Sequence, residues 1–98
     1  MKTLQAELAA FRDARDWRQY HTAEALARAI AVEAGELNTL FLWGAAPPLS
    51  RLADEVADVM IFALNLCNVE GFDAEAIIRE KISKNADRPV LQDGRLGA

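Results

Sequence analysis

Two pairs of acidic residues, each with i, i+3 spacing, are the residues of this chain best suited to chemistry. Glu33 and Glu36 lie in one helix-forming stretch, and Glu55 and Asp58 lie in a second. On an α-helix this spacing places both side chains on one face, about 5–6 Å apart at Cβ. Carboxylates that converge in an apolar setting repel one another unless a positive charge sits among them. Because hard divalent cations prefer oxygen ligands, the pattern predicts a divalent-cation site formed by these four acids.

The helical positions of the four acids differ in how strongly they support this prediction. With a rotation of about 100° per residue, Glu33 falls in the middle of the apolar arc of its helix and Glu36 on the edge of that arc. Glu55 falls at the margin of the second apolar arc, and Asp58 lies further round. A buried salt-bridge cluster is the structural alternative. Its cations would be Arg51, Lys81, Lys84 and Arg88.

Apolar periodicity and breaker residues predict an all-α fold. We expect a first helix over 3–14 and a second over 22–43, then a third over 50–71 and a fourth over 73–86. Thr3, Thr22, Ser50 and Asp73 are the expected N-caps. Short connections make neighbouring helices pack antiparallel, so the second and third should form a hairpin that joins the two acid pairs. Residues 1–90 are expected to form one domain, and 91–98 an irregular C-terminal tail.

Composition narrows the classes of partner. The chain has 98 residues, of which 52% are hydrophobic, and so small a domain hides that much apolar surface best by forming a homo-oligomer. A net charge of −4 disfavours a nucleic acid polymer as partner. The longest apolar stretch, 59–64, is too short to span a membrane. Cys67 is the lone cysteine, which excludes a disulfide framework, allows a reducing compartment and fits a cytoplasmic location.

Basic and polar residues gather on the fourth expected helix. Lys81 and Asn85 share its inward side, Lys84 lies at the margin, and Arg88 returns to the inward side if the helix extends that far. Such a set makes a poor core, but it suits contacts to phosphate or to the edge of a base. The alternative is a group of cations that complements the C-terminal end of the helix dipole.

Aromatic residues flank the second expected helix. Trp17, Tyr20 and His21 precede it and Trp43 closes it, so they are candidates for a slot that holds a planar ring. The alternative is that they seal the ends of the helix bundle. The chain has no Glu-x-x-His motif, which disfavours the di-iron carboxylate class of helical bundles.

In order and spacing, five segments of the chain resemble the MazG-like nucleotide pyrophosphohydrolases, and within them the dCTP-type and integron-type branch. The resemblance runs over residues 4–90 and implies an all-α, four-helix MazG-like bundle completed by oligomerisation, as a homodimer or homotetramer. It also implies hydrolysis of a nucleoside triphosphate to the monophosphate and pyrophosphate with Mg²⁺, or with Mn²⁺ in its place. The five segments are 11–17, 20–22, 33–37, 55–61 and 80–85.

The resemblance also implies roles for individual residues. Glu33, Glu36, Glu55 and Asp58 would be catalytic metal ligands, with Glu36 as the expected general base. The basic set would contact phosphates or sugar, and the aromatic set would line the base pocket. We therefore expect a cytoplasmic enzyme that removes dCTP-like or modified deoxynucleotides. The basic set is Lys81, Lys84, Asn85 and Arg88, and the aromatic set is Trp17, His21 and Trp43.

Two other functions remain open at this level. One is a non-catalytic helical module for oligomerisation or interaction, in which the acids form internal salt bridges. The other is an enzyme like phosphoribosyl-ATP pyrophosphohydrolase, which is also all-α. Base and sugar preference, the number of metal ions and the choice between dimer and tetramer also stay open.

Overall fold

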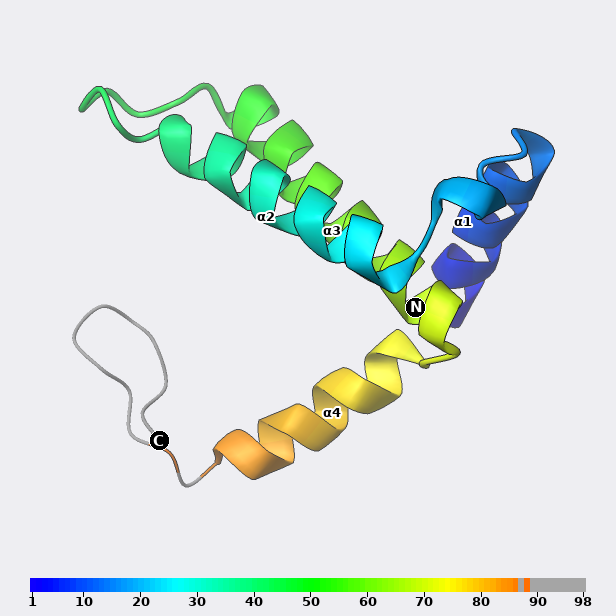
Figure 1. Cartoon of the computed structure of the whole chain (residues 1–98). Helices are drawn as coiled ribbons and strands as arrows, with labels where there is room; N and C mark the ends of the chain where they lie inside the picture. The colour runs from blue at the N-terminus through cyan, green and yellow to red at the C-terminus, as the bar shows by residue number, and fades with distance from the viewer. Residues whose placement is uncertain (87, 89–98) are drawn as a thin grey trace.

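A computed structural model describes residues 1–86 and residue 88 of the chain, and those residues form α-helices and one short 3₁₀-helix, with no strand among them (Figure 1). The expected all-α fold is confirmed. The predicted tail 91–98 lies outside the described residues. The elements are α1 (Lys2–Ala14), η1 (Arg18–Tyr20), α2 (Ala23–Thr39), α3 (Leu49–Glu70) and α4 (Ala74–Asn85).

Polar caps start two of the helices as the sequence predicts. The hydroxyl oxygen of Thr22 accepts a hydrogen bond from the Ala25 amide at 3.1 Å, and a carboxylate oxygen of Asp73 accepts one from the Ala76 amide at 3.1 Å. Each bond satisfies an amide that the first helical turn leaves without a partner. Gly71 ends α3 in the left-handed region with φ of 73°, which a residue without Cβ adopts at little cost.

Three helix ends differ from the expectation. Thr3 lies inside α1 and Ser50 lies inside α3, because those helices begin one residue earlier, after Met1 and Pro48, without a side-chain cap. The second helix ends at Thr39, four residues before Trp43. There the backbone switches to i, i−3 hydrogen bonds, and the Thr39 hydroxyl donates to the Glu36 carbonyl oxygen at 2.6 Å. These tighter bonds end the α-helical ladder.

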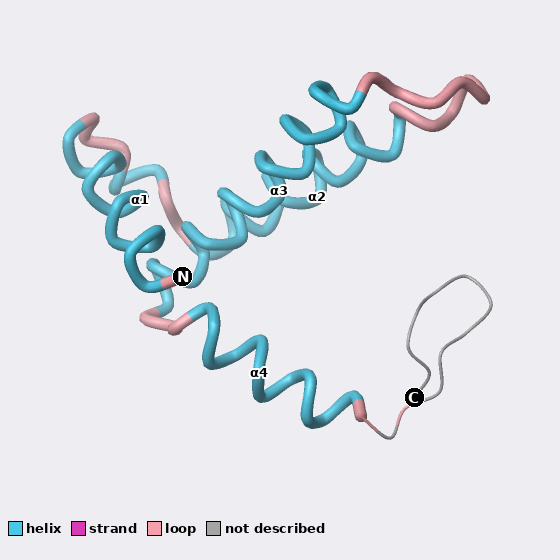
Figure 2. Tube along the Cα trace, turned by 180° about the vertical axis from the view of Figure 1, so that it is seen from behind, coloured by secondary structure: helices cyan, strands magenta, loops and turns pink. Residues whose placement is uncertain are grey.

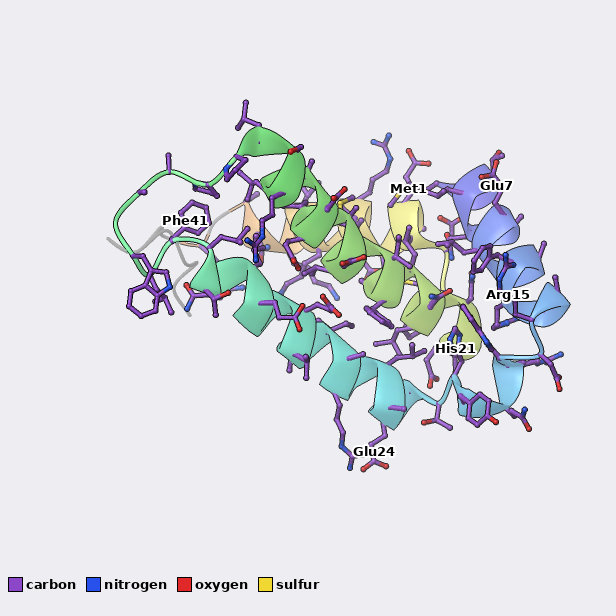
Figure 3. All side chains as sticks on the ribbon, turned by 90° about the horizontal axis from the view of Figure 1, so that it is seen from above. Met1, Glu7, Arg15, His21, Glu24 and Phe41 are labelled. Atoms are coloured by element: carbon purple, nitrogen blue, oxygen red, sulfur yellow. The ribbon has the colours of Figure 1, made fainter. Side chains whose placement is uncertain are left out.

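α2 and α3 form a helical hairpin, and α1 and α4 are the two helices outside it. α2 and α3 pack side by side along their length, and α1 packs against the C-terminal half of α3 (Figures 1 and 2). Seen from above, His21 lies at the end of the hairpin next to α1, and Phe41 lies at the opposite end (Figure 3). The predicted hairpin of the second and third helices is thereby confirmed.

α4 departs from the predicted packing. After the turn at Gly71 it extends away from the α2–α3 hairpin, so α3 and α4 do not pack antiparallel (Figures 1 and 2). The expectation that neighbouring helices pair was wrong for α3 and α4, because the left-handed turn at Gly71 sends α4 outward. It was also wrong for α1 and α2, since α1 packs mainly against α3. Within one chain, α4 therefore does not cover the α2–α3 hairpin as the fourth helix of a closed bundle would.

Four hydrogen bonds between α1 and the α3–α4 turn hold these elements together. The Gln5 amide donates to the Asn68 side-chain oxygen at 3.1 Å and to the Phe72 carbonyl oxygen at 2.9 Å. Its oxygen accepts a bond from the buried Ala74 amide at 2.9 Å. In return, Asn68 donates to the Gln5 carbonyl oxygen at 3.0 Å. Gln5 thus links the start of α1 to the start of α4.

The core within one chain is small. Leu64, Cys67 and Ala74 form a buried cluster against which Leu8 packs. No described helix has the length and apolarity that crossing a lipid bilayer requires. Large hydrophobic side chains stay exposed along α4 and on the face of α3 near it. They include Val56, Met60, Ile77, Ile78 and Ile82.

Candidate functional site

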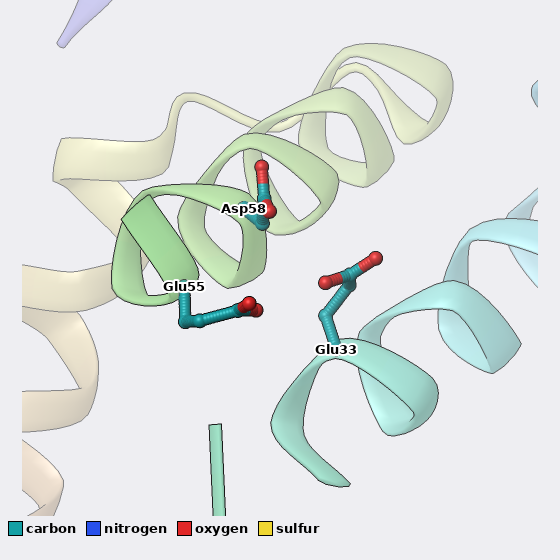
Figure 4. A group of neighbouring side chains, drawn as sticks. All are labelled: Glu33, Glu55 and Asp58. Atoms are coloured by element: carbon teal, nitrogen blue, oxygen red, sulfur yellow. The ribbon is translucent and has the colours of Figure 1, made fainter. Parts of the chain in front are cut away.

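Three of the four predicted metal ligands converge in the hairpin. Glu33 on α2 faces Glu55 and Asp58 on α3, and one carboxylate oxygen from each lies within 4.8 Å of the others (Figure 4). The i, i+3 spacing places Glu55 and Asp58 on the same side of α3, and the antiparallel pairing brings Glu33 opposite them. Glu33 and Glu55 are half-buried between the helices, and Asp58 is exposed.

The buried oxygens of this group lack hydrogen-bond partners. One carboxylate oxygen of Glu33 and one of Glu55 are inaccessible to solvent and bonded to no described group. Within residues 1–86, none of the four acids pairs with a lysine or arginine, so the salt-bridge alternative is not supported for Arg51, Lys81 and Lys84. The ion pairs that are seen join Lys2 to Asp73, Arg12 to Asp13, Arg28 to Glu24, Arg79 to Glu75, and Lys84 to Glu80.

The electrostatics of Glu33 reflect this arrangement. Loss of hydration is the largest of the effects that raise the pKa of the Glu33 carboxyl. Repulsion from Glu36 and a hydrogen bond with Glu36 raise this pKa further, and so does repulsion from Asp58 and Glu55. Each of these effects disfavours the charged form. A cation among the acids would reverse the balance, because opposite charge favours ionisation. The donor set of carboxylate oxygens fits a hard divalent ion such as Mg²⁺.

Glu36, the fourth predicted ligand, is placed differently. It is exposed one helical turn after Glu33, and it does not belong to the group of three whose oxygens converge. Its carboxylate is still close enough to Glu33 to perturb the Glu33 pKa. This position, beside the cluster and open to solvent, is compatible with its predicted role as a general base.

A cavity of about 360 Å³ lies between α1, η1 and α3, next to the acids along α3. Trp17 and His21 line it, as the sequence predicted for a ring-binding slot, and Phe11 meets the Trp17 ring edge-on with centroids 5.6 Å apart. Burial, and then the nearby Arg12 guanidinium, lower the pKa of His21 and favour its neutral form. The cavity is lined by Leu4, Glu7, Leu8, Phe11, Arg12, Trp17, His21, Ile61, Phe62 and Asn65.

Arg12 and Asn65 are polar residues of this cavity that sequence reasoning missed. Both are buried, at 9% and 6% exposure. Asn65 falls in the apolar run of α3, two residues before Cys67, and an asparagine in such a run is the signal that could have singled it out. Arg12 gave no such signal, since its burial depends on how α1 packs.

Trp43, the third aromatic residue predicted for the ring slot, lies elsewhere. It is 88% exposed in the connector between α2 and α3, where it borders a separate hollow with Pro47 and Arg51. That connector is at the end of the hairpin opposite His21, close to Phe41 (Figure 3). Within one chain the structure therefore does not bring Trp43 to Trp17 and His21.

Of the basic set, Lys81, Lys84 and Asn85 lie on α4, whereas Arg88 follows the helix, which ends at Asn85. Lys81 and Lys84 are exposed, and Lys84 pairs with Glu80 at 3.1 Å. The Arg88 guanidinium donates to the Asn85 side-chain oxygen at 3.0 Å. α4 points away from the α2–α3 hairpin that carries the acids (Figure 1).

Comparison with known proteins gives two informative matches, while no protein-family model matches the chain. Mouse dCTP pyrophosphatase 1 is 34% identical over 98 aligned residues, which cover 90% of this chain and 56% of the mouse protein. The chain thus spans little more than half the length of that relative. The crystal structure of a pyrophosphatase from Archaeoglobus fulgidus superposes with a TM-score of 0.79 at 33% identity, covering 87% of each chain.

Proposed function

The chain belongs to the MazG-like nucleotide pyrophosphohydrolase family, and from this premise we propose that it is a Mg²⁺-dependent nucleoside triphosphate pyrophosphohydrolase. It would convert a nucleoside triphosphate and water to the monophosphate and pyrophosphate. Its proposed substrates are dCTP-like or modified deoxynucleotides, in line with the name of the mouse relative. Mn²⁺ is a proposed substitute for Mg²⁺.

One observation carries this proposal. Glu33 and Glu55 each hold a buried carboxylate oxygen with no described partner, and these oxygens belong to the group of three acids that converge within 4.8 Å. Unpaired buried carboxylates are costly, so a chain built only for packing would gain by replacing them. Their retention is explained if a divalent cation, delivered with a triphosphate, completes the site.

The proposed mechanism assigns one role to each group of acids. Glu33, Glu55 and Asp58 would hold the cation, and Glu36, exposed beside Glu33, would accept the proton of the attacking water. When bound, the cation neutralises phosphate charge and activates water for attack at the α-phosphorus. The half-buried position of Glu33 and Glu55 limits solvent at one side of the cluster, which strengthens every electrostatic contact there.

We further propose that the active unit is a homodimer or homotetramer. Within the described residues, the α4 side chains Ile77, Ile78 and Ile82 remain 39%, 47% and 64% exposed, and such apolar surface is buried most simply against another copy. In that assembly the basic set of one subunit's α4 would approach the acids of its partner. Lys81, Lys84, Asn85 and Arg88 would then contact phosphate or sugar.

The decisive experiment is a pyrophosphate-release assay over canonical and modified triphosphates, with and without Mg²⁺. We expect Mg²⁺-dependent release by the wild type and its loss in Glu33→Gln and Glu55→Gln, with helical content unchanged by circular dichroism. Glu24→Gln is the matched control, since Glu24 is an exposed glutamate of the same α2 that pairs with Arg28. Full activity in Glu33→Gln or Glu55→Gln would contradict the assignment.

A further inference from the structure

The cavity beside α1 has apolar walls and one deeply buried amide. Asn65 is 6% exposed, and its side-chain oxygen is inaccessible to solvent and bonded to no described group. A buried amide oxygen without a partner costs free energy, whereas an apolar side chain of the same shape would avoid that cost. Asn65 therefore marks a place where a ligand with a hydrogen-bond donor would be held.

Arg12 adds hydrogen-bond donors to the same cavity. Its guanidinium is almost fully buried, and its Nε donates to the neighbouring Asp13 carboxylate at 3.1 Å. No described residue accepts a hydrogen bond from its two terminal nitrogens. Arginine carries donors and no acceptor, so these nitrogens can donate to an acceptor on a ligand. Asn65 and Arg12 thus place an amide and a guanidinium at the wall of this cavity, beside its aromatic residues.

The position of Asn65 along α3 relates the cavity to the acids. Asn65 follows Asp58 by seven residues, which on an α-helix is about 10 Å along the axis and only about 20° in rotation. The two side chains therefore lie on the same face of α3, with Phe62 between them. A nucleotide has a comparable reach from its phosphates to its base, so one molecule can occupy both places.

We propose that Asn65, assisted by Arg12, is the residue that determines base specificity. The Asn65 oxygen accepts a hydrogen bond from an exocyclic amino group of the base, and Arg12 donates to the neighbouring ring nitrogen or carbonyl oxygen. The aromatic and aliphatic walls, among them Phe11, Trp17 and Phe62, enclose the planar ring. This inference rests on the proposed function, because it takes the ligand to be a nucleotide.

A site built around a buried polar group discriminates strongly between ligands that can and cannot form a hydrogen bond with that group. A pocket with a buried acceptor rejects an analogue that lacks the donor, because the acceptor is then left without a partner. dCTP and dUTP are a matched pair of substrates, since an amino group of the first is a carbonyl oxygen in the second. We expect the wild type to favour dCTP over dUTP by about tenfold to a hundredfold in kcat/KM.

The experiment measures kcat/KM for dCTP and dUTP by pyrophosphate release in the wild type, Asn65→Leu and Asn65→Asp. Leucine has the shape of asparagine without its polar atoms and should bring the two substrates to within about threefold of each other. Aspartate keeps the acceptor and should retain the preference for dCTP. Asn38→Leu, which removes an exposed amide on α2, is the control and should leave the ratio unchanged.

A second measurement separates this inference from the proposed function. Calorimetric titration with dCMP and dUMP reports base recognition without hydrolysis. If the wild type releases no pyrophosphate but binds dCMP more tightly than dUMP, and Asn65→Leu loses that difference, the proposed function is wrong and Asn65 keeps its role. An unchanged dCTP/dUTP ratio in Asn65→Leu, or equal binding of both monophosphates by the wild type, overturns the inference.

Discussion

Gln5→Met is a substitution whose effect on stability can be worked out from the structure. Methionine matches glutamine in length but can neither donate nor accept the hydrogen bonds that Gln5 makes. Three side-chain bonds are lost, to Asn68, to the Phe72 carbonyl oxygen and from the Ala74 amide. Ala74 is 1% exposed, so its amide is then buried without a partner.

The expected loss of stability follows from these contacts. A neutral hydrogen bond contributes about 0.5–1.5 kcal/mol, and a buried donor left without a partner costs about 1–3 kcal/mol. Methionine recovers part of the loss because it buries apolar surface in place of the amide. We expect a net decrease of about 2–4 kcal/mol in the free energy of unfolding, or roughly 10–25 °C in Tm for a domain of this size.

Thermal unfolding followed by circular dichroism, at fixed protein concentration, measures this change. The matched comparison is Asn65→Leu, which also removes a buried amide. Because the Asn65 side-chain oxygen has no described partner, that substitution should raise the free energy of unfolding by about 1–2 kcal/mol. The two buried amides should therefore shift Tm in opposite directions, and a fall of similar size in both variants would refute the reasoning.

Three further predictions concern the acids and α4. Millimolar Mg²⁺ should raise the Tm of the wild type by several degrees and that of Glu33→Gln by much less, because a ligand of the native state stabilises it; an equal rise in both would place the ion elsewhere. Hydrogen bonds from the Ala76 and Glu75 amides, together with Lys2, outweigh desolvation and hold the pKa of Asp73 below its usual range. The stability from Asp73 is therefore present above its unfolded-state pKa and lost as pH falls through its folded-state pKa. Asp73→Asn should flatten that acid limb in pH-dependent melts, and an unchanged limb would contradict this. Finally, Ile82 is 64% exposed within one chain, so Ile82→Asp should shift the oligomer toward monomer in sedimentation velocity while helical content stays the same; an unchanged sedimentation profile would remove α4 from the interface.

Local signals predicted the helices well and their ends less well. Thr22 and Asp73 cap their helices as expected, because a side-chain oxygen at an N-cap serves amides only two or three residues away. Thr3 and Ser50 have the same chemistry but lie inside helices that begin without a polar cap. A capping residue shows where a helix can start, but both of these helices begin one residue earlier than expected.

The candidate site was predicted in part. The i, i+3 spacing correctly paired Glu55 with Asp58, and the short connection correctly placed Glu33 opposite them. Trp17 and His21 line one cavity, whereas Trp43 lies at the other end of the hairpin within one chain, and a ring-binding role for the three residues stays a prediction. Spacing along one helix is a local property, whereas the ends of a hairpin are separated by its full length, which the aromatic residue types do not reveal.

The sequence by itself determined the helices, the acid pairs and the surplus of apolar residues, because periodicity and turn chemistry act over a few neighbouring residues. Only the tertiary structure decided that α4 leaves the hairpin and that Asn65 and Arg12 meet in one cavity. Those outcomes depend on the left-handed turn at Gly71 and on contacts between α1 and α3, residues more than fifty positions apart in the chain. Such contacts form between whole helix faces, so no short stretch of sequence contains them.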